Sequence, residues 1–312
     1  MKKFEHIRDL RMGFGTAFAF KCLTTRLISK EKYNRLIYNR LYEDYSSIIS
    51  LYKNKRNEEN INENERINVW IFWWQGVDSA PEIVKKCIDS IYKNFSPLFF
   101  NVFLITKENI KEYCDFPSYI YSKLASKRIT LTHFSDLIRA NLLSRHGGLW
   151  IDATVYVSSK VSREPMCNLP FFTIKSQTKK NLIINNRWTG FFLYAPKGTV
   201  LFKFLNDFFM EYWKKNHYLI DYLLVDFGIA LAVENISVCR DDYNMVPATN
   251  ESIIRLLPLL NKPYSENIWK NLKSNTQFFK LSYKKEIVGS DFVYYVKNKK
   301  TFYGKIIDGE LL

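Results

Sequence analysis

Cysteine and histidine are scarce in this sequence of 312 residues, which contains 5 Cys and 4 His. The cysteines are scattered and form no CxxC pair, so the sequence predicts neither a disulfide framework nor a zinc site. Such cysteine usage favours a reducing, cytoplasmic location. His133, His146 and His217 are also widely spaced, and each is interpreted as a hydrogen-bonded, partly exposed side chain rather than a metal ligand.

Long apolar runs and glycine-based motifs are also lacking. No run approaches about 20 residues, the length that a membrane-spanning helix needs. Residues 12–20, the longest candidate near the N-terminus, stop at Lys21 without a small-residue cleavage site, so no signal peptide is predicted. Without a GxSxG, P-loop or GxGxxG motif, hydrolase, kinase and dinucleotide-binding functions have no support.

Acidic residues are few relative to basic ones: 31 Asp and Glu against 46 Lys and Arg give a net charge of +15. Such an excess predicts an anionic partner, which can be nucleic acid, acidic lipid or a phosphorylated substrate. Aromatic residues, by contrast, make up 16% of the chain. They supply enough apolar surface for a sizeable core, with some left for stacking or interfacial contacts.

The chain is predicted to have two parts, a basic helical N-terminal segment with a linker (residues 1–65) and a larger α/β domain (residues 66–312). Ten basic and three acidic side chains occur in residues 1–40, and apolar residues in this part recur at a rough helical spacing. Residues 54–68 are polar and contain no aromatic side chain, which is typical of a linker or an exposed loop.

Strand and helix patterns alternate after the linker. The expected strands are residues 69–76 (VWIFWWQG), 101–106 and 149–157, and the expected helices are residues 81–92, 118–127 and 135–145. The uninterrupted apolar character of the strands indicates a sheet covered on both faces. Together with the alternation, it predicts βαβ crossovers and an open α/β sheet.

Residues 133–154 form the main candidate site. Asp136 and Arg139 are three residues apart on a predicted helix and share one face, and the Gly-Gly pair that follows allows a sharp turn. Asp152 is the single acid in the next apolar strand, where a carboxylate is costly unless it faces a ligand or a cation at the strand's end. Beside a diphosphate, this acid can hold Mg²⁺ or Mn²⁺. The alternative is structural: Asp152 caps a helix or pairs with Arg139 and only orders the turn.

These motifs together resemble a known pattern. The residues Ser135-Asp136-x-x-Arg139, followed by GGLWID at 147–152, resemble the SDxxR…GGxYxDxD pattern of sugar-nucleotide glycosyltransferases. That group includes family 32 glycosyltransferases, the large clostridial glucosylating toxins and the bacterial capsular polysaccharide synthesis proteins. The last are the most similar, with WWQG at the first strand and D-A-T as the acid motif. The resemblance covers roughly residues 68–230, with a weaker match at 279–284.

The resemblance implies a GT-A fold, a UDP-sugar donor, a divalent metal (Mn²⁺ or Mg²⁺) and, usually, retention at the anomeric carbon. By position, Asp136 and Arg139 correspond to residues that bind the ribose or donor sugar and its diphosphate, and Asp152 to the metal-binding acid. Thr154 replaces the motif's second aspartate. Either Thr154 or a water completes the metal shell, or Lys and Arg side chains share the neutralisation. The other expected donor-binding residues are Trp73, Trp74, Gln75, Gly76, Asn186, Asp226, Lys280 and Lys284.

Several of these residues also have a structural interpretation. The tryptophans can simply bury in the sheet core, although Trp74 is favoured over Trp73 as the residue that stacks on the uracil ring. Asn186 can hydrogen-bond donor hydroxyls or belong to an ordinary turn. Lys280 and Lys284 can contact the diphosphate as point charges or form a solvated basic end of the chain.

Two functions fit the sequence. The favoured one is a hexosyltransferase acting on a capsular polysaccharide or lipid-linked acceptor, and the alternative is a basic nucleic-acid-binding protein without enzymatic activity. The basic residues are dispersed and no nucleic-acid-binding motif occurs, which favours the enzyme. A basic face also suits a peripheral enzyme at an anionic membrane. Residues 1–45 are expected either to lie in such an interface or to pack on the catalytic domain.

Overall fold

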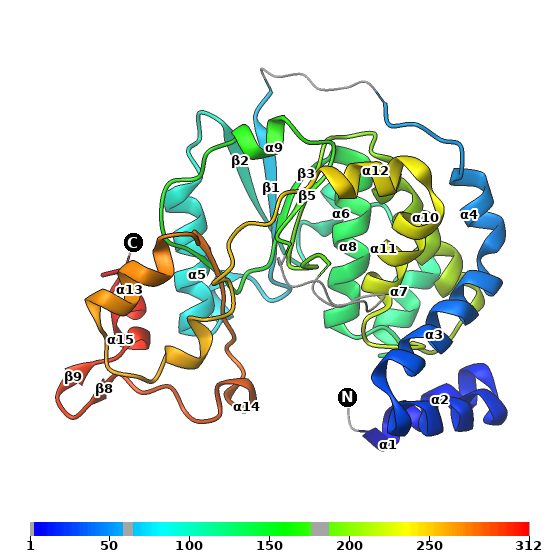
Figure 1. Cartoon of the computed structure of the whole chain (residues 1–312), viewed down its shortest axis with the longest axis horizontal. Helices are drawn as coiled ribbons and strands as arrows, with labels where there is room; N and C mark the ends of the chain where they lie inside the picture. Colours follow the sequence, from blue (N-terminus) through cyan, green and yellow to red (C-terminus); the bar gives the residue numbers. More distant parts are fainter. Residues whose placement is uncertain (1–2, 59–64, 176–186, 312) are drawn as a thin grey trace.

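A five-stranded sheet with the order β2-β1-β3-β6-β5 forms the centre of the molecule (Figure 1). The computed structural model describes residues 3–58, 65–175 and 187–311. Strands β2, β1 and β3 are mutually parallel, and β6 runs antiparallel to its neighbours β3 and β5. This mixed, mostly parallel sheet confirms the predicted α/β architecture of GT-A type. The strands of the two smaller sheets pair as β4 with β7 and β8 with β9.

The strands have the following bounds: β1 Ile67–Phe72, β2 Phe100–Ile105, β3 Gly148–Ile151, β4 Val155–Val157, β5 Phe172–Thr173, β6 Phe192–Ala195, β7 Phe278–Lys280, β8 Tyr295–Val296 and β9 Lys299–Lys300. The helices are α1 Lys3–Phe14, α2 Thr16–Ile28, α3 Lys30–Asp44, α4 Ser46–Tyr52, α5 Glu82–Asn94, α6 Ile110–Tyr113, α7 Ser118–Ala125, α8 Leu131–His146, α9 Glu164–Cys167, α10 Val200–Lys215, α11 Leu224–Asn235, α12 Ser237–Met245, α13 Glu266–Lys273, α14 Lys285–Val288 and α15 Phe302–Ile307.

Helices cover both faces of the sheet. Helix α5 and the C-terminal helices α13 to α15 lie on one side in Figure 1, and α8, α10 and α11 lie on the other. Helix α5 buries Ile83, Val84, Cys87, Ile88 and Ile91, which recur at helical spacing along one face. Helix α15 packs against α5, so residues beyond β7 belong to the folded core of the molecule.

Two expected strands have different bounds from those predicted. Residues 69–76 do not form one strand, because β1 ends at Phe72 and the chain then turns. Residues 149–157 form two strands in different sheets, β3 and β4, with a turn at 152–154 between them. The amide of Asp152 still donates to the Phe191 carbonyl at 3.0 Å, but Val155 already donates back to Asp152 at 2.9 Å. The break places Asp152 at the carboxyl end of β3.

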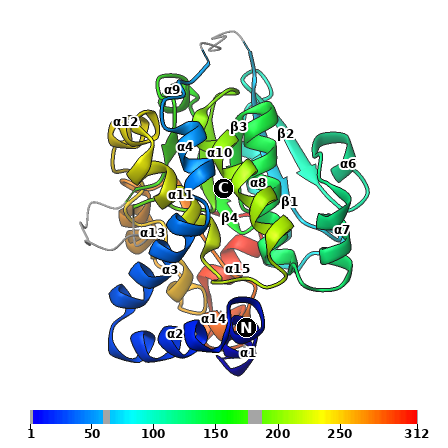
Figure 2. The ribbon, with the colours of Figure 1, turned by 90° about the vertical axis from the view of Figure 1, so that its right-hand side faces the viewer.

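The N-terminal helices pack on the larger domain (Figure 2). Helix α4 contacts α10, and α3 contacts α11. Tyr33 of α3 donates a hydrogen bond to Asp221 at 2.6 Å, and Tyr52 of α4 donates to Asp207 at 2.6 Å. Ile37 of α3 is fully buried. Of the two arrangements expected for residues 1–45, packing on the catalytic domain is therefore the one that α3 adopts, together with the helix α4 that follows it. No helix within the described residues is both long and apolar enough to cross a membrane.

Gly147 and Gly148 connect α8 to β3 in a conformation that only glycine adopts without strain. Their φ angles are 64° and 101°. A Cβ on Gly148 would lie 2.3 Å from the carbonyl oxygen of Asn68 in β1, and a Cβ on Gly147 would lie 2.3 Å from the amide nitrogen of Lys197. The pair therefore lets β3 start in close contact with its neighbours.

We expect Gly148→Ala to lower the free energy of unfolding by about 3 kcal/mol or more, because backbone strain and a backbone clash act together. Gly309→Ala is the matched control, since Gly309 also has a positive φ of 73° but no atom within 4 Å of the added Cβ. It should cost only about 1–2 kcal/mol. Urea unfolding of both variants gives the comparison, and equal losses would contradict the close-contact argument.

Candidate functional site

A cavity of about 700 Å³ lies where β1 and β3 end and α8 begins. Its wall includes residues 72–75 at the end of β1 and after it, residues 152–154 after β3, and residues 280–284 in and after β7. Because β1 and β3 are parallel, their carboxyl ends meet at one edge of the sheet. This edge is where open α/β sheets bind ligands.

Helix α8 carries two charged side chains toward β3. The hydroxyl of Thr130 caps the helix by accepting a hydrogen bond from the His133 amide at 3.2 Å. One turn further on, Asp136 Oδ1 lies 3.3 Å from Arg139 Nη2, and both side chains are buried. The spacing of three residues thus places them on one face as predicted.

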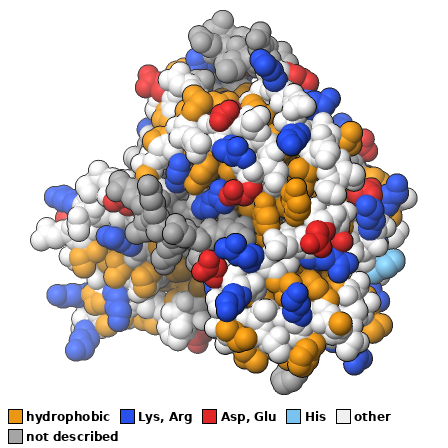
Figure 3. Space-filling view, turned by 45° about the vertical axis from the view of Figure 1, so that its right-hand side comes forward, with side chains coloured by type: hydrophobic (Ala, Val, Ile, Leu, Met, Phe, Trp, Pro, Cys, Tyr) orange, Lys and Arg blue, Asp and Glu red, His pale blue; other side chains and the backbone are white. Residues whose placement is uncertain are grey.

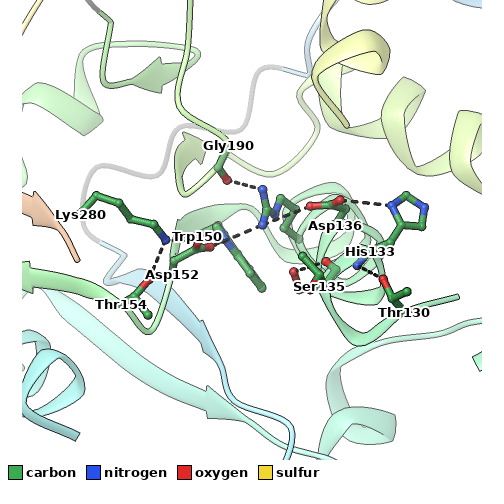
Figure 4. Close-up of polar contacts among 11 residues, drawn as sticks. Thr130, His133, Ser135, Asp136, Trp150, Asp152, Thr154, Gly190 and Lys280 are labelled. Atoms are coloured by element: carbon green, nitrogen blue, oxygen red, sulfur yellow. Dashed lines mark hydrogen bonds and ion pairs between the residues drawn. The ribbon is translucent and has the colours of Figure 1, made fainter. Parts of the chain in front are cut away.

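Arg139 connects Asp136 to Asp152 in the turn after β3, and Figure 4 labels both of these carboxylates. Its Nη2 lies 3.5 Å from Asp152 Oδ1, and its Nη1 donates to the carbonyl of Gly190. The guanidinium also lies over the ring of Trp150, 5.0 Å from the centroid. The Trp150 indole donates to the same oxygen of Asp152 at 2.9 Å. The Asp152–Arg139 pair of the structural interpretation is therefore present.

The other oxygen of Asp152 faces Lys280. The Lys280 ammonium lies 2.6 Å from Asp152 Oδ2 and 2.6 Å from Thr154 Oγ1, and Figure 4 shows it between the two. The pairing of β4 with β7 brings it there, because Val155 lies opposite Lys280 in the antiparallel register. The side chains of Lys280 and Asp152 are 24% and 26% exposed, so the pair borders the cavity.

Lys280 and Arg139 also determine the ionisation of Asp152. Burial alone would raise the pKa of this carboxyl, but the charges of Lys280 and Arg139, with hydrogen bonds from Lys280 and Trp150, hold the pKa below its usual range. Asp152 is therefore a carboxylate at neutral pH, with a cation on each side.

His133 forms a hydrogen bond with Asp136, the carboxylate that pairs with Arg139. The indole of Trp213 can only donate, and it lies 2.9 Å from His133 Nε2, so this nitrogen is the acceptor. The ring proton is then on Nδ1, 3.2 Å from Asp136 Oδ2, and donates to it. His133 is buried, which corrects the expectation of a partly exposed side chain. Its role is to orient Asp136.

Aromatic side chains line the part of the cavity that follows β1. Trp73 contacts Tyr283 edge to face with centroids 5.4 Å apart, and Trp74 contacts Phe134 in the same way at 5.8 Å. Both tryptophans are only partly buried and lie beyond the end of β1, whereas Trp70 is a core residue. Both therefore remain candidates for stacking on a planar base, and the preference for Trp74 stays a prediction.

The other expected donor-binding residues do not all lie at the cavity. Gln75 and Lys284 line the cavity, but Gly76 and Asp226 are not among its described lining residues. Gly76 has a φ of 80° in the turn after β1. Asp226 lies in the first turn of α11 and accepts a hydrogen bond from the Trp188 indole at 2.9 Å. Asn186 lies outside the described residues.

Residues 152–154 are a poor ligand set for Mn²⁺ or Mg²⁺, which need carboxylate oxygens that are available to coordinate. One oxygen of Asp152 accepts from Trp150 and lies near Arg139, while the other oxygen and the Thr154 hydroxyl bind Lys280. Over residues 3–58, 65–175 and 187–311, no three His, Cys, Asp or Glu side chains group as metal ligands. A metal at Asp152 and Thr154 stays a prediction, and the donor atoms present do not fit it.

Three residues of the site were not predicted as functional: His133, Trp150 and Tyr283. Trp150 could have been found, because residues two apart on a strand point to the same face, and its indole therefore reaches Asp152. Tyr283 lies in the matched segment 279–284 but has no local motif of its own. The helical spacing of three residues places His133 beside Asp136, but Trp213, which fixes the tautomer of the ring, is 80 residues away and has no local signal.

Two comparisons with known proteins bear on this geometry. The model of a family described as capsular polysaccharide synthesis protein matches residues 21–306, a range that includes every site residue described above and part of the N-terminal segment. The O-glycosyltransferase braB of Annulohypoxylon truncatum is 25% identical over 165 residues. That region is 47% of this chain and 37% of the fungal protein, so the chain spans little more than a third of the relative it matches.

Asp226 gives the site a pH-dependent neighbour. Burial raises the pKa of Asp226 to about 7, against the lowering effect of the Trp188 hydrogen bond, and the charge of Asp136 raises it further. The folded chain thus holds this proton more tightly than the unfolded chain. The resulting stabilisation is complete below about pH 4 and is lost as the pH rises through 7.

We expect the stability of Asp226→Asn, relative to that of the wild type, to rise by about 2 kcal/mol when the pH is raised from about 5.5 to about 8. The variant keeps an oxygen for the Trp188 indole and removes the titrating group. Urea unfolding at both pH values measures the effect, with the exposed Asp115→Asn as the control for loss of a carboxylate. A stability difference that does not change with pH would contradict the raised pKa.

Proposed function

We propose that this chain, which belongs to the capsular polysaccharide synthesis protein family, is a glycosyltransferase that moves a hexose from a UDP-linked donor to a polysaccharide or lipid-linked acceptor. The observation that carries the proposal is the cavity at the ends of β1 and β3, which combines aromatic rings with the charged groups of Asp152, Lys280 and Lys284. Such a wall suits a ligand with a planar base and a diphosphate. The name of the fungal relative, an O-glycosyltransferase, supports the same reaction class.

In this proposal the nucleotide lies along the cavity wall. Trp73 or Trp74 stacks on the base, a contact commonly worth about 1–3 kcal/mol. Lys280 and Lys284, which border the same cavity, meet the diphosphate. Asp136 and Arg139 lie behind Asp152 and are not among the described lining residues, so their part is to position the turn at 152–154.

The reaction exchanges one bond at the anomeric carbon. The bond from this carbon to the β-phosphate oxygen breaks, and its electron pair stays on the departing UDP. The acceptor hydroxyl forms the new bond on the face that UDP leaves and passes its proton to the departing phosphate oxygen, which gives the retention of configuration that the family resemblance implies. Negative charge develops on UDP in this step, and the fixed cation of Lys280 at the cavity border is placed to stabilise it.

We also propose that α1 and α2 hold the enzyme at the cytoplasmic face of an anionic membrane, close to its acceptor. Met12, Phe20, Leu27 and Ile28 of these helices are 61–70% exposed. Exposed Arg and Lys side chains lie among them, and Figure 3 shows hydrophobic and basic side chains side by side at the height of these helices in Figure 1. This combination is typical of helices that lie in a lipid interface. The nucleic-acid alternative draws only on composition, that is on net charge and aromatic content, and is not proposed.

The donor specificity can be tested directly. The purified chain is incubated with a panel of UDP-hexoses, and UDP release is measured. We expect release from at least one donor, and Asp152→Asn and Asp136→Ala each to reduce the rate at least about a hundredfold, because the cation arrangement that stabilises UDP is lost. The exposed Asp241→Asn is the control for removal of an acid. Normal turnover by folded Asp152→Asn would refute the assignment of the site, and release from no donor would refute the proposed function.

The membrane proposal predicts that the full chain floats with phosphatidylglycerol vesicles at low salt and less so at high salt. The triple variant Phe20→Asp, Leu27→Asp, Ile28→Asp should bind at least about tenfold more weakly, since it removes exposed apolar surface and adds like charge. Leu98→Asp is the matched control, because Leu98 is 77% exposed and lies far from these helices in the sequence. Equal flotation of the triple variant and the wild type would contradict the assignment.

A further inference from the structure

The ammonium of Lys280 lies where the D-A-T motif would otherwise present its oxygens to a metal. It is within hydrogen-bond distance of Asp152 Oδ2 and of Thr154 Oγ1, the first and third side chains of the motif. The single positive charge therefore already bridges the two groups that were expected to share a divalent ion.

The position of Lys280 is set by the fold and not by a flexible tail. Its amide donates to the carbonyl of Ile253 at 2.7 Å, and the next amide, from Leu281, donates to the carbonyl of Thr154 at 2.8 Å. The ammonium also lies 4.9 Å from the centroid of the Phe191 ring. These contacts hold the backbone of β7 against the turn at 152–154, so the side chain has a short and defined reach to Asp152.

A divalent ion at the same oxygens would have to lie within a few ångströms of the ammonium. Like charges at such a distance, in a partly desolvated site, repel each other strongly. The ion would also compete with Lys280, Trp150 and Arg139 for the oxygens of Asp152. Lys280 thus disfavours metal at this site on both counts.

We propose that the ammonium of Lys280 replaces the divalent cation, so that it binds the diphosphate of the nucleotide donor directly and donor binding needs no metal. This inference rests on the proposed function, in which the donor carries a nucleoside diphosphate. An ammonium has three N–H donors, and the hydrogen bonds to Asp152 and Thr154 use two of them, which leaves one for a phosphate oxygen at the cavity border. The leaving UDP then keeps this hydrogen bond as its charge develops.

Thr154 fits the same arrangement. Its hydroxyl accepts from Lys280 without adding a negative charge, whereas an aspartate there would present the carboxylate that a metal needs. In the double variant Lys280→Ala, Thr154→Asp, binding of the diphosphate through a divalent metal should therefore replace binding through the ammonium. It removes the ammonium and provides two carboxylates, and its affinity for UDP should become dependent on Mn²⁺.

The experiment is titration of UDP by isothermal calorimetry, in EDTA and in excess MnCl₂. For the wild type we expect dissociation constants that agree within about threefold in the two buffers. In EDTA, Lys280→Met should bind UDP at least about tenfold more weakly, and Lys280→Arg should recover part of that loss. Lys285→Met, which removes an exposed lysine paired with Asp291 outside the described cavity wall, should bind as the wild type does.

The outcomes separate the two proposals. Wild-type binding that disappears in EDTA and returns with Mn²⁺ overturns the role of Lys280 and leaves the proposed function standing. Binding of UDP in neither buffer overturns both. Equal binding in both buffers, with a loss in Lys280→Met, supports the inference. If Lys280→Met does not fold, as measured by circular dichroism, the wild-type comparison and the double variant still decide.

Discussion

An alternating line of charges joins the three parts of the chain that build the site. Asp136 and Arg139 come from α8, Asp152 follows β3, and Lys280 ends β7, with contacts of 3.3, 3.5 and 2.6 Å between successive members. Buried or half-buried charges are tolerated only when each is paired, and here every member has an opposite charge beside it. Removing Arg139 deprives Asp136 of its opposite charge, and removing Asp152 does the same to Lys280. The turn at 152–154, the end of α8 nearest the cavity and β7 therefore depend on one another.

Local patterns predict the parts of this line that lie close in sequence. Lys280 is expected at the donor from the weaker family match at residues 279–284, but its contact with Asp152 is not predicted. Asp136 and Arg139 follow from helical spacing, and the Gly-Gly turn followed by an acid at a strand's end indicates a ligand-binding edge. Lys280 is 128 residues from Asp152, and its position depends on the register of β7 against β4. A register shift of one residue would turn Lys280 to the other face of that sheet. No local pattern in the sequence fixes such a register.

Other differences from the predicted fold have a similar origin. The apolar residues 149–157 predict one strand, because periodicity cannot reveal that a chain leaves one sheet and enters another. Here the switch occurs at residues 152–154, the turn that carries Asp152 and Thr154. In the same way, the helical spacing of residues 1–45 predicts helices but not their partners. Asp207 and Asp221 accept hydrogen bonds from Tyr52 and Tyr33, and each is more than 150 residues from its tyrosine in the sequence.

The replacement of an aspartate by Thr154 is best understood through the charge of the whole line. Asp136 and Asp152 contribute two negative charges, and Arg139 and Lys280 contribute two positive ones, so this line of four side chains is neutral. A third carboxylate at position 154 would leave an uncompensated charge in a partly desolvated place, and a bound cation would be needed to offset it. With threonine, the hydroxyl only orients the ammonium. Thr154 and Lys280 thus depend on each other: the protein supplies its own cation at the border of the cavity, and the neutral hydroxyl orients it.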